Sequence, residues 1–343
     1  MQTSVKLCVF EPSQRKSFNS KSFDIGREAH LLFTMTDEFS RPLRALSVSF
    51  LSLGVLSVSV PSFALEFKET KSVILTADGP DTGKSAYKLI KKALGSKAME
   101  SPDLYKSNHR GAPHIIEDTD DVVGPHFVFL SHRDEDKDRD KDALDRQRNE
   151  IKAYDSSKKR LKAYKGDTMQ YRWKFKIDDG FEFSKNFTHF FQIKAKNLSK
   201  WSHSKDSDKF PVVTFTAVDK GDGRNEFQLR HSPSVTEDGR RPKHTKLVTA
   251  DMVQFTGQWV EFFVQATFAN DGQLIVRATN VESGKTLIDF EQSGIDMWRG
   301  ESGEDFSRPK WGIYRSLKQK ESLRAEEEKA RFADFEIRKG ILE

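Results

Sequence analysis

The sequence has almost no cysteine: Cys8 is the only one among 343 residues. A single thiol excludes a scaffold held by disulfides and any zinc site built from cysteines. An excess of charge of one sign is also missing, because 57 Lys and Arg against 52 Asp and Glu leave a formal net charge of only +5. This near balance argues against a large basic surface, and we predict no nucleic-acid partner.

Long apolar runs are scarce too, and the run that stands out lies near the N-terminus. Residues 45–60 (ALSVSFLSLGVLSVSV) carry no charge, and Arg41 and Arg44 precede them. Residues 61–64 (PSFA) then end on a small-x-Ala pattern. A basic start, a short apolar stretch and such an exit are typical of a secretory signal rather than a membrane span. A buried apolar helix remains the alternative interpretation.

The predicted signal divides the chain into three parts. We predict that residues 35–64 are a secretory signal peptide, that residues 1–34 are an upstream extension or a wrongly assigned start, and that residues 65–343 form one domain. Cleavage after Ala64 would also remove Cys8, so packing alone would stabilise the exported domain. We expect a secreted or periplasmic protein without stable membrane insertion after cleavage, and a monomer.

Aromatic residues are plentiful: the chain has 27 Phe, and hydrophobic residues make up 36% of it, enough for a sizeable core. From residue 126 onward, apolar side chains recur with a period of two between turn signals, which is typical of strands. The expected strands are 126–130, 146–152, 170–177, 188–195, 211–218, 226–230, 258–268, 273–280, 286–291, 310–315 and 332–337. Residues 84–99 instead have helical spacing. The pattern predicts an all-β sandwich or jelly roll with a short N-terminal helix.

Two strongly charged segments are interpreted as solvated structure. Residues 131–148 (SHRDEDKDRDKDALDRQR) are expected to form a loop with internal ion pairs, and residues 321–331 (ESLRAEEEKAR) a solvated helix or insertion. A structural calcium ion in the first segment stays open, because carboxylates are calcium ligands. Nearby histidines follow no zinc-ligand spacing; these are His109, His114, His126 and His132. Apart from that open question of calcium, we predict no metal site and no cofactor.

Three of the expected strands place polar side chains along one face, because side chains alternate between faces. These side chains are Arg146, Arg148, Glu150 and Lys152 in the first strand, Gln192 and Lys194 in the second, and Lys310 and Tyr314 in the third. Each strand alone is what any solvent-facing strand shows. Together they form a polar wall that suits an anionic sugar polymer. Alternation also places Arg230 on the polar face of another expected strand.

These strands carry a resemblance to a known family. Arg148-x-Glu150-x-Lys152, Gln192-Ile193-Lys194 and Lys310-x-Gly312-x-Tyr314 resemble the three signature strands of jelly-roll polysaccharide lyases. The third motif is most similar to heparin lyase I-like and glucuronan lyase-like members, which are related in motif to alginate lyases. The resemblance implies a concanavalin-like β-jelly roll and a secreted enzyme, a polysaccharide lyase that cleaves a uronic-acid-containing polysaccharide by β-elimination.

The family's chemistry implies roles for individual residues. A base removes the proton on C5, an acid protonates the leaving O4, and hydrogen-bond donors neutralise the adjacent carboxylate as an oxyanion hole does. By resemblance, Arg148 and Gln192 neutralise the carboxylate and Tyr314 transfers protons. Lys310 shares the face of Tyr314, and its positive charge is expected to favour the phenolate. The other wall residues are expected to bind substrate: Arg146, Glu150, Lys152, Arg230 and Lys310.

One departure from the family pattern leaves the identity of the base open. Where alginate lyases have Gln-Ile-His, this sequence has Gln-Ile-Lys, ending on Lys194. The base is then a desolvated Lys194, or Tyr314 acting as both base and acid, or His189. Alternation puts His189 on the opposite face unless a bulge intervenes. We favour Tyr314 in both roles, with Lys194 as an electrostatic helper.

Two other classes of function stay open at this point. A non-catalytic jelly roll that binds acidic carbohydrate would use the same basic wall without cleaving the polymer. A glycoside hydrolase would need two carboxylates flanking the scissile bond, and Glu150 has no evident partner in these motifs. The lyase is therefore the leading hypothesis.

Overall fold

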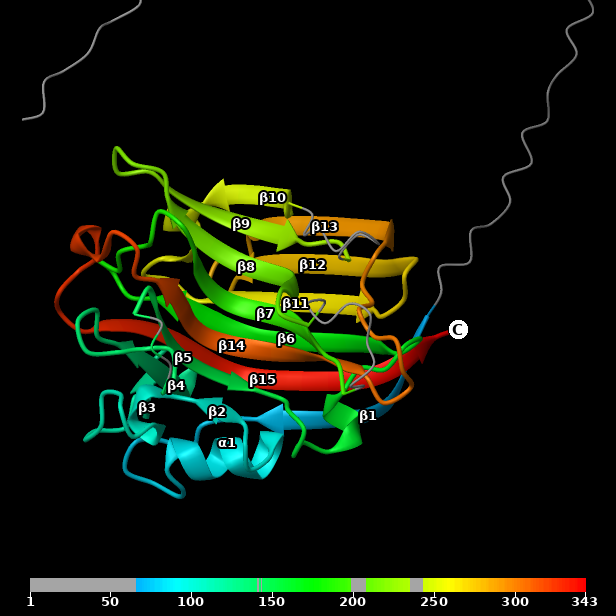
Figure 1. The fold of residues 1–343 in the computed structure, drawn as a ribbon, viewed down its shortest axis with the longest axis horizontal. Helices are drawn as coiled ribbons and strands as arrows, with labels where there is room; N and C mark the ends of the chain where they lie inside the picture. The colour runs from blue at the N-terminus through cyan, green and yellow to red at the C-terminus, as the bar shows by residue number, and fades with distance from the viewer. Residues whose placement is uncertain (1–65, 141, 143, 199–207, 235–242) are drawn as a thin grey trace, which may run out of the picture. The chain divides into compact units, whose positions relative to one another are not determined.

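The computed structural model describes residues 66–343 except 141, 143, 199–207 and 235–242. The predicted signal peptide and upstream extension lie outside the described residues. Within the described part, fifteen strands form two antiparallel sheets, accompanied by one α-helix and four short 3₁₀ helices (Figure 1). No helix in this part of the chain is long and apolar enough to cross a membrane.

The first sheet has eight strands. Its order is β13 (Thr286–Ile295), β12 (Gly272–Asn280), β11 (Val260–Thr267), β6 (Thr168–Ile177), β15 (Glu328–Leu342), β4 (Gly124–Ser131) and β3 (Ile115–Asp120), with β1 (Phe67–Leu75) also paired to β15. The second sheet has seven strands. Its order is β10 (Thr245–Asp251), β9 (Asn225–His231), β8 (Pro211–Asp219), β7 (Thr188–Lys196), β14 (Phe306–Ser316), β5 (Arg146–Lys152) and β2 (Met99–Glu100).

This architecture confirms the predicted all-β, concanavalin-like jelly-roll sandwich with a short N-terminal helix. Alternation located most of the strands, and β5 begins and ends where it was expected, although both of its faces are largely buried. Four strands were missed: β1, β2, β3 and β10. Of these, β1 and β10 are largely exposed, and β2 has only two residues, so they lack a long alternating pattern.

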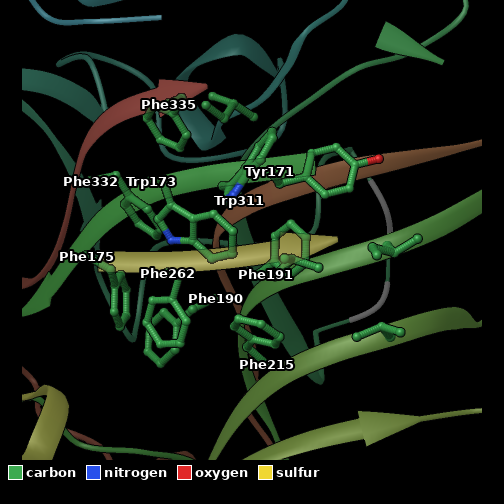
Figure 2. Packing of buried hydrophobic residues seen from close by; sticks show 14 of the residues in the cluster. Tyr171, Trp173, Phe175, Phe190, Phe191, Phe215, Phe262, Trp311, Phe332 and Phe335 are labelled. Atoms are coloured by element: carbon green, nitrogen blue, oxygen red, sulfur yellow. The ribbon is translucent and has the colours of Figure 1, made fainter. Parts of the chain in front are cut away.

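Aromatic rings from both sheets fill the space between them (Figure 2). Trp173 of β6 stacks on Phe191 of β7 with ring centroids 4.7 Å apart, and it meets Trp311 of β14 edge to face at 5.9 Å. Phe262 of β11 contacts Phe215 of β8 at 5.1 Å. Offset and edge-to-face pairs of this kind add to the burial of apolar area. The core therefore fixes the positions of β7, β8 and β14, whose other faces carry the polar wall.

The single α-helix, α1 (Ala86–Leu94), is shorter than expected. Ala86, Ile90 and Leu94 are buried at a spacing of four residues, so the apolar stripe that predicted the helix does face the protein. Gly95 follows with φ +111°, outside the helical region, and ends the helix. The 3₁₀ helices lie at Pro102–Leu104, Lys159–Leu161, Met252–Phe255 and Lys320–Ser322.

The interpretation of residues 321–331 as a solvated helix or insertion is wrong for its last four residues. Glu328 begins β15, and its carboxylate is buried against the guanidinium of Arg315 on β14. The side chains of both residues are at most 1% exposed. A charged run can therefore enter a sheet when one of its charges has a buried partner on a strand of the other sheet, which spacing alone does not reveal.

The interpretation of residues 131–148 as a solvated loop is also wrong in part. Asp136 and Asp138 are only 3% and 2% exposed, although several of their neighbours face solvent. Asp138 pairs with Arg148 on β5 and with Arg139, and Asp136 contacts histidines. The loop thus contributes two buried carboxylates to the interior, and both matter for the sites below.

Candidate active site

Strand register brings the predicted wall residues into two rows across the seven-stranded sheet. In the first row, Tyr314 of β14 lies opposite Arg148 of β5 on one side and opposite His189 of β7 on the other. In the second row, Lys310 lies opposite Gln192, which in turn lies opposite Thr214 of β8. Residues 118 to 166 positions apart in the sequence therefore become neighbours because β14 lies between β5 and β7 (Figure 1).

A cavity of about 530 Å³ opens on this face. Its lining residues are Arg146, Arg148, Asn186, Phe187, His189, Gln192, Lys194, Lys209, Phe210, Pro211, Thr214, Arg230, Ser232, Lys243, His244 and Tyr314. Six of them are Lys or Arg, and none is Asp or Glu. Walls of one charge sign concentrate ligands of the opposite sign. The cavity is therefore suited to an anionic molecule.

His189 lies on the cavity side, although simple alternation put it on the opposite face. The pairing of β7 with β8 shifts register between His189 and Phe191, and the pairing of β7 with β14 shifts between Trp311 and Tyr314. An extra residue of this kind re-aims a side chain. Phe190 and Phe191 are both buried in the core as a result, and His189 faces the cavity. The bulge that would bring His189 to the wall is present.

A hydrogen bond holds the His189 ring in place, and burial determines its protonation state. Its Nδ1 lies 2.8 Å from the Thr216 hydroxyl, and its ring stacks on Phe187 with centroids 4.6 Å apart. Burial, followed by the charges of Arg230 and Arg148, lowers the pKa of His189 well below its usual value. The imidazole is therefore neutral at neutral pH and can accept a proton.

Two guanidinium groups surround the Tyr314 side chain. The Arg146 Nη1 donates a hydrogen bond to the Tyr314 hydroxyl at 3.1 Å. The Arg148 guanidinium carbon lies 3.6 Å from the centre of the Tyr314 ring, a cation–π contact. The ring of His189 is 5.9 Å away between centroids. The cations next to Tyr314 are thus Arg146 and Arg148, whereas the sequence had suggested Lys310.

Arg148 is held by two carboxylates. Its Nε lies 2.7 Å from Asp138 Oδ1 and its Nη2 lies 3.3 Å from Asp138 Oδ2, a two-pronged contact. Its Nη1 also bonds Glu150. Burial would lower the pKa of Arg148, but Glu150 and Glu100 outweigh it and raise that pKa well above the usual value. Arg148 is therefore a fixed positive charge under the Tyr314 ring.

Beside the cavity, the remaining wall charges form a buried ion cluster. Glu150 accepts hydrogen bonds from Lys310 at 2.5 Å and from the Gln192 amide. Glu100 of β2 lies 2.8 Å from Lys310 and 2.7 Å from Lys152. The exposed fractions of these side chains lie between 2% and 7%, apart from Gln192, whose whole residue is 2% exposed. Glu150, Lys152 and Lys310 do not line the cavity; they support it from within.

Lys194 and Arg230 do line the cavity, and burial changes the acidity of both. Burial lowers the pKa of Lys194 to about 7, and the positive charges of Lys310 and Arg148 act in the same direction. The Lys194 Nζ donates to the Lys209 carbonyl at 3.0 Å. Burial likewise lowers the pKa of Arg230 to about 10. Near neutral pH, Lys194 is therefore divided between its charged and neutral forms.

Sequence reasoning missed several residues of this site. Glu100 and Asp138 hold the wall charges in place. Glu100, however, lies on a strand of only two residues, and Asp138 lies in a loop that the sequence predicts to be solvated. Lys209, Lys243 and His244 reach the cavity from the segments that lead into β8 and β10. Lys209 precedes an expected strand, whereas Lys243 and His244 precede β10, which was not expected; cations beside strands are common on protein surfaces and mark no site.

In the part of the chain that the structure describes, the cavity lining holds no group of three or more histidine or carboxylate ligands that could bind a metal. One such group occurs elsewhere, in the loops beside β3 and β4. The cavity itself is therefore a set of cations, amide, imidazole and phenol groups on a β-sandwich.

No protein-family model matches the chain, and no curated protein matches it. Solved structures do show similarity. The endo-β-1,4-glucuronan lyase of the fungus Trichoderma reesei is 11% identical with a TM-score of 0.48, over 80% of this chain and 96% of that one. A marine PL-14 alginate lyase from Aplysia kurodai is 10% identical with a TM-score of 0.46, over 79% and 98%. The alginate lyase Aly36B, in a mutant bound to an alginate tetrasaccharide, is 10% identical with a TM-score of 0.48, over 79% and 98%. These values concern the fold and assign no role to any residue.

Proposed function

We propose that the protein is a polysaccharide lyase that cleaves a uronic-acid-containing polysaccharide by β-elimination. The observation that carries the proposal is the cavity on the seven-stranded sheet. It gathers a phenol, a neutral imidazole and an amide among six Lys or Arg side chains, and no lining residue is Asp or Glu. A glycoside hydrolase would need two carboxylates at the scissile bond, and the lining does not supply them.

In the proposed reaction, the uronate carboxylate lies near Gln192 and the cavity cations. The Gln192 amide lines the cavity and is held in place by Glu150. A neutralised carboxylate makes the C5 proton more acidic, because charge that develops on the carboxylate as the proton leaves is stabilised by fixed donors. Arg148 is already bound to Asp138, so it contributes through its fixed charge and through the position of Tyr314.

We assign the base to His189 and the acid to Tyr314. His189 takes the C5 proton as the C4=C5 double bond forms and the C4–O4 bond breaks, and the Tyr314 hydroxyl gives a proton to O4. The neutral state and cavity position of His189 support this assignment over Tyr314 in both roles. A bound uronate would offset the charges of Arg230 and Arg148, so it would raise the basicity of the imidazole where it is needed. Lys194 then helps to hold the anionic chain.

The proposal is tested by Tyr314→Phe and His189→Gln, with Tyr164→Phe as a matched control outside the cavity. Loss of a general acid or base costs about 10²–10⁴-fold in rate, so both cavity variants should lose turnover by that factor and still bind the polymer. Tyr164→Phe should be as active as the wild type. Full activity of both cavity variants would refute the assigned roles. Polymer binding without turnover in the wild type would favour a non-catalytic acidic-carbohydrate-binding protein.

We also propose that the protein is exported, as the apolar stretch at 45–60 and the small-x-Ala exit before residue 65 suggest. N-terminal sequencing of protein recovered from the medium or periplasm of an expressing bacterium should then begin at Leu65. Protein that keeps its first 64 residues and stays inside the cell would refute export by this signal.

A further inference from the structure

A cluster of metal-ligand side chains lies outside the cavity, where the chain enters β3 and leaves β4. We call it the histidine cluster, and its members are His109, His114, His132 and Asp136. His114 immediately precedes β3 and His132 immediately follows β4. The antiparallel pairing of these strands brings the two imidazoles together, with a hydrogen bond from the Leu130 amide to the His114 carbonyl at 2.9 Å. The cluster is therefore built on a sheet edge.

Four atoms of the cluster face one another. His114 Nε2 lies 3.0 Å from His109 Nδ1 and 3.1 Å from Asp136 Oδ1, and His109 Nδ1 lies 3.0 Å from the same oxygen. All four candidate ligand atoms lie within 4.8 Å of one another. Zn–N bonds of about 2.0–2.1 Å place the corners of a tetrahedron about 3.3–3.4 Å apart. Three of the atoms, at 3.0–3.1 Å, therefore need to move apart by only a few tenths of an ångström, and the fourth lies within 4.8 Å of them.

The fourth atom, His132 Nδ1, is buried and has no hydrogen-bond partner. The His132 ring lies 4.7 Å from the His109 ring and 5.0 Å from the His114 ring between centroids, so this nitrogen lies beside the same group of atoms. Its closest carboxylate contact is Asp136 Oδ2 at 3.5 Å. A buried polar atom without a partner costs free energy unless something binds it. A metal ion at the centre would satisfy this nitrogen.

The outward atoms of the cluster already have the partners that zinc ligands usually have. His109 Nε2 lies 2.8 Å from Glu135, and His132 Nε2 lies 3.1 Å from Glu327. His114 Nδ1 lies 3.1 Å from the Ala112 carbonyl. The second oxygen of Asp136 accepts the His132 backbone amide at 2.7 Å. Zinc-bound histidines commonly donate their second ring nitrogen to a carboxylate or carbonyl in this way.

We propose that the histidine cluster binds one Zn²⁺ ion in a closed structural site. Three imidazole nitrogens and one carboxylate oxygen make a four-coordinate set that suits zinc and is too rich in nitrogen for calcium or magnesium. His114 and Asp136 are almost fully buried, whereas His109 and His132 are 23% and 22% exposed and leave a path for the ion. Spacing in the sequence missed this site because its ligands come from two separate loops.

The zinc ion would fasten the loop that positions Arg148. Asp136 is two residues from Asp138, which holds the Arg148 guanidinium under the Tyr314 ring. Asn108, next to His109, bonds the carbonyls of Lys137 and Arg139 at 3.1 Å each. The site therefore connects the His109 loop, the Asp136–Asp138 loop and, through Glu327, the approach to β15.

The experiment measures zinc binding directly on untagged protein. The metal content is determined after chelation and dialysis against zinc, and Co²⁺ is added as a spectroscopic probe, because tetrahedral Co²⁺ absorbs strongly in the visible. The expected result is one zinc per chain, a tetrahedral cobalt spectrum and slower tryptic cutting at Arg133 and Lys137 with zinc than with chelator.

Variants separate this site from adventitious zinc. Glu327→Gln, which changes only the partner of His132, should weaken zinc affinity about 10–100-fold. His109→Ala should weaken it further, and Arg110→Ala, an exposed neighbour, should leave it unchanged. Zinc bound equally by His109→Ala and the wild type would overturn the proposal. If His109→Ala fails to fold, the wild type still decides, because less than one zinc per chain or an octahedral cobalt spectrum would equally overturn it.

Discussion

Glu150 pairs with two cations of the buried ion cluster, Arg148 and Lys310, and its neutralisation gives a sharp prediction. The Glu150→Gln change keeps the shape of the side chain and removes one negative charge from a residue that is 1% exposed. Arg148, Lys152 and Lys310 would then face only Glu100 and Asp138. Removing one partner of a buried pair costs about 3–5 kcal/mol, because the other charge stays buried without compensation.

Melting experiments measure this cost. A change of 1 kcal/mol shifts Tm by about 2–4 °C in a domain of this general size, so Glu150→Gln should lower Tm by about 10 °C. The double variant Glu150→Gln/Lys310→Met restores the charge balance and should recover much of the loss. Glu261→Gln is the control: its partner Arg172 is 45% exposed, and the pair should contribute less than about 1 kcal/mol.

The Tm difference between the wild type and Glu150→Gln should also change with pH in a definite direction. Burial would raise the pKa of Glu150, but Lys310 and Arg148 outweigh it and lower that pKa. A carboxyl with a lowered folded pKa stabilises the protein fully above its unfolded pKa, about 4.3 for Glu. This stabilisation is lost as the pH falls through the folded pKa. The Tm difference should therefore shrink below pH 4. A Tm within 1–2 °C of wild type at pH 7 (about 0.5 kcal/mol), or a double variant no better than the single one, would refute the account of the ion cluster.

Two further predictions concern the cavity. Because the pKa of Lys194 is about 7, its charge is present at pH 6 and mostly absent at pH 8, so KM for an anionic polymer should rise over this range in the wild type and stay flat in Lys194→Met. A rate that instead rises with pH and is abolished in Lys194→Met would identify Lys194 as the base. Gly312 has φ +132°, and a Cβ there would lie 2.2 Å from the Asn149 carbonyl oxygen. Gly312→Ala should therefore push β14 away from β5 and lower the free energy of unfolding by more than about 1 kcal/mol. A thermal denaturation experiment in which Gly312→Ala has the same Tm as the wild type would contradict the close approach of these strands.

The sequence predicted the fold well because most strands carry their information locally. β5 has a charge at every second position, and in β14 the core positions Trp311 and Ile313 followed from alternation alone. Strands without such a pattern, such as β1 with its run of exposed residues, could not be found in the same way.

The site was less predictable because its decisive contacts are not local. The face of His189 depends on a bulge in β7, and one extra residue leaves no mark in the hydrophobic pattern. Asp138 and Glu100 hold the wall charges from a loop and a two-residue strand, and their carboxylates look like any solvated charge in sequence. Pairings across the chain decide which charges are buried, and a single sequence does not record them.

The central claim, β-elimination of a uronate polymer, is tested most directly by the product. The protein is mixed separately with glucuronan, alginate, heparin, heparan sulfate, hyaluronan and pectate, and the ultraviolet absorbance of a conjugated C4=C5 uronate is followed, with product masses determined alongside. The account predicts a rise with at least one polymer and fragments whose new non-reducing end is unsaturated. Fragments that carry an added water and no double bond, or no cleavage of any polymer, would contradict it.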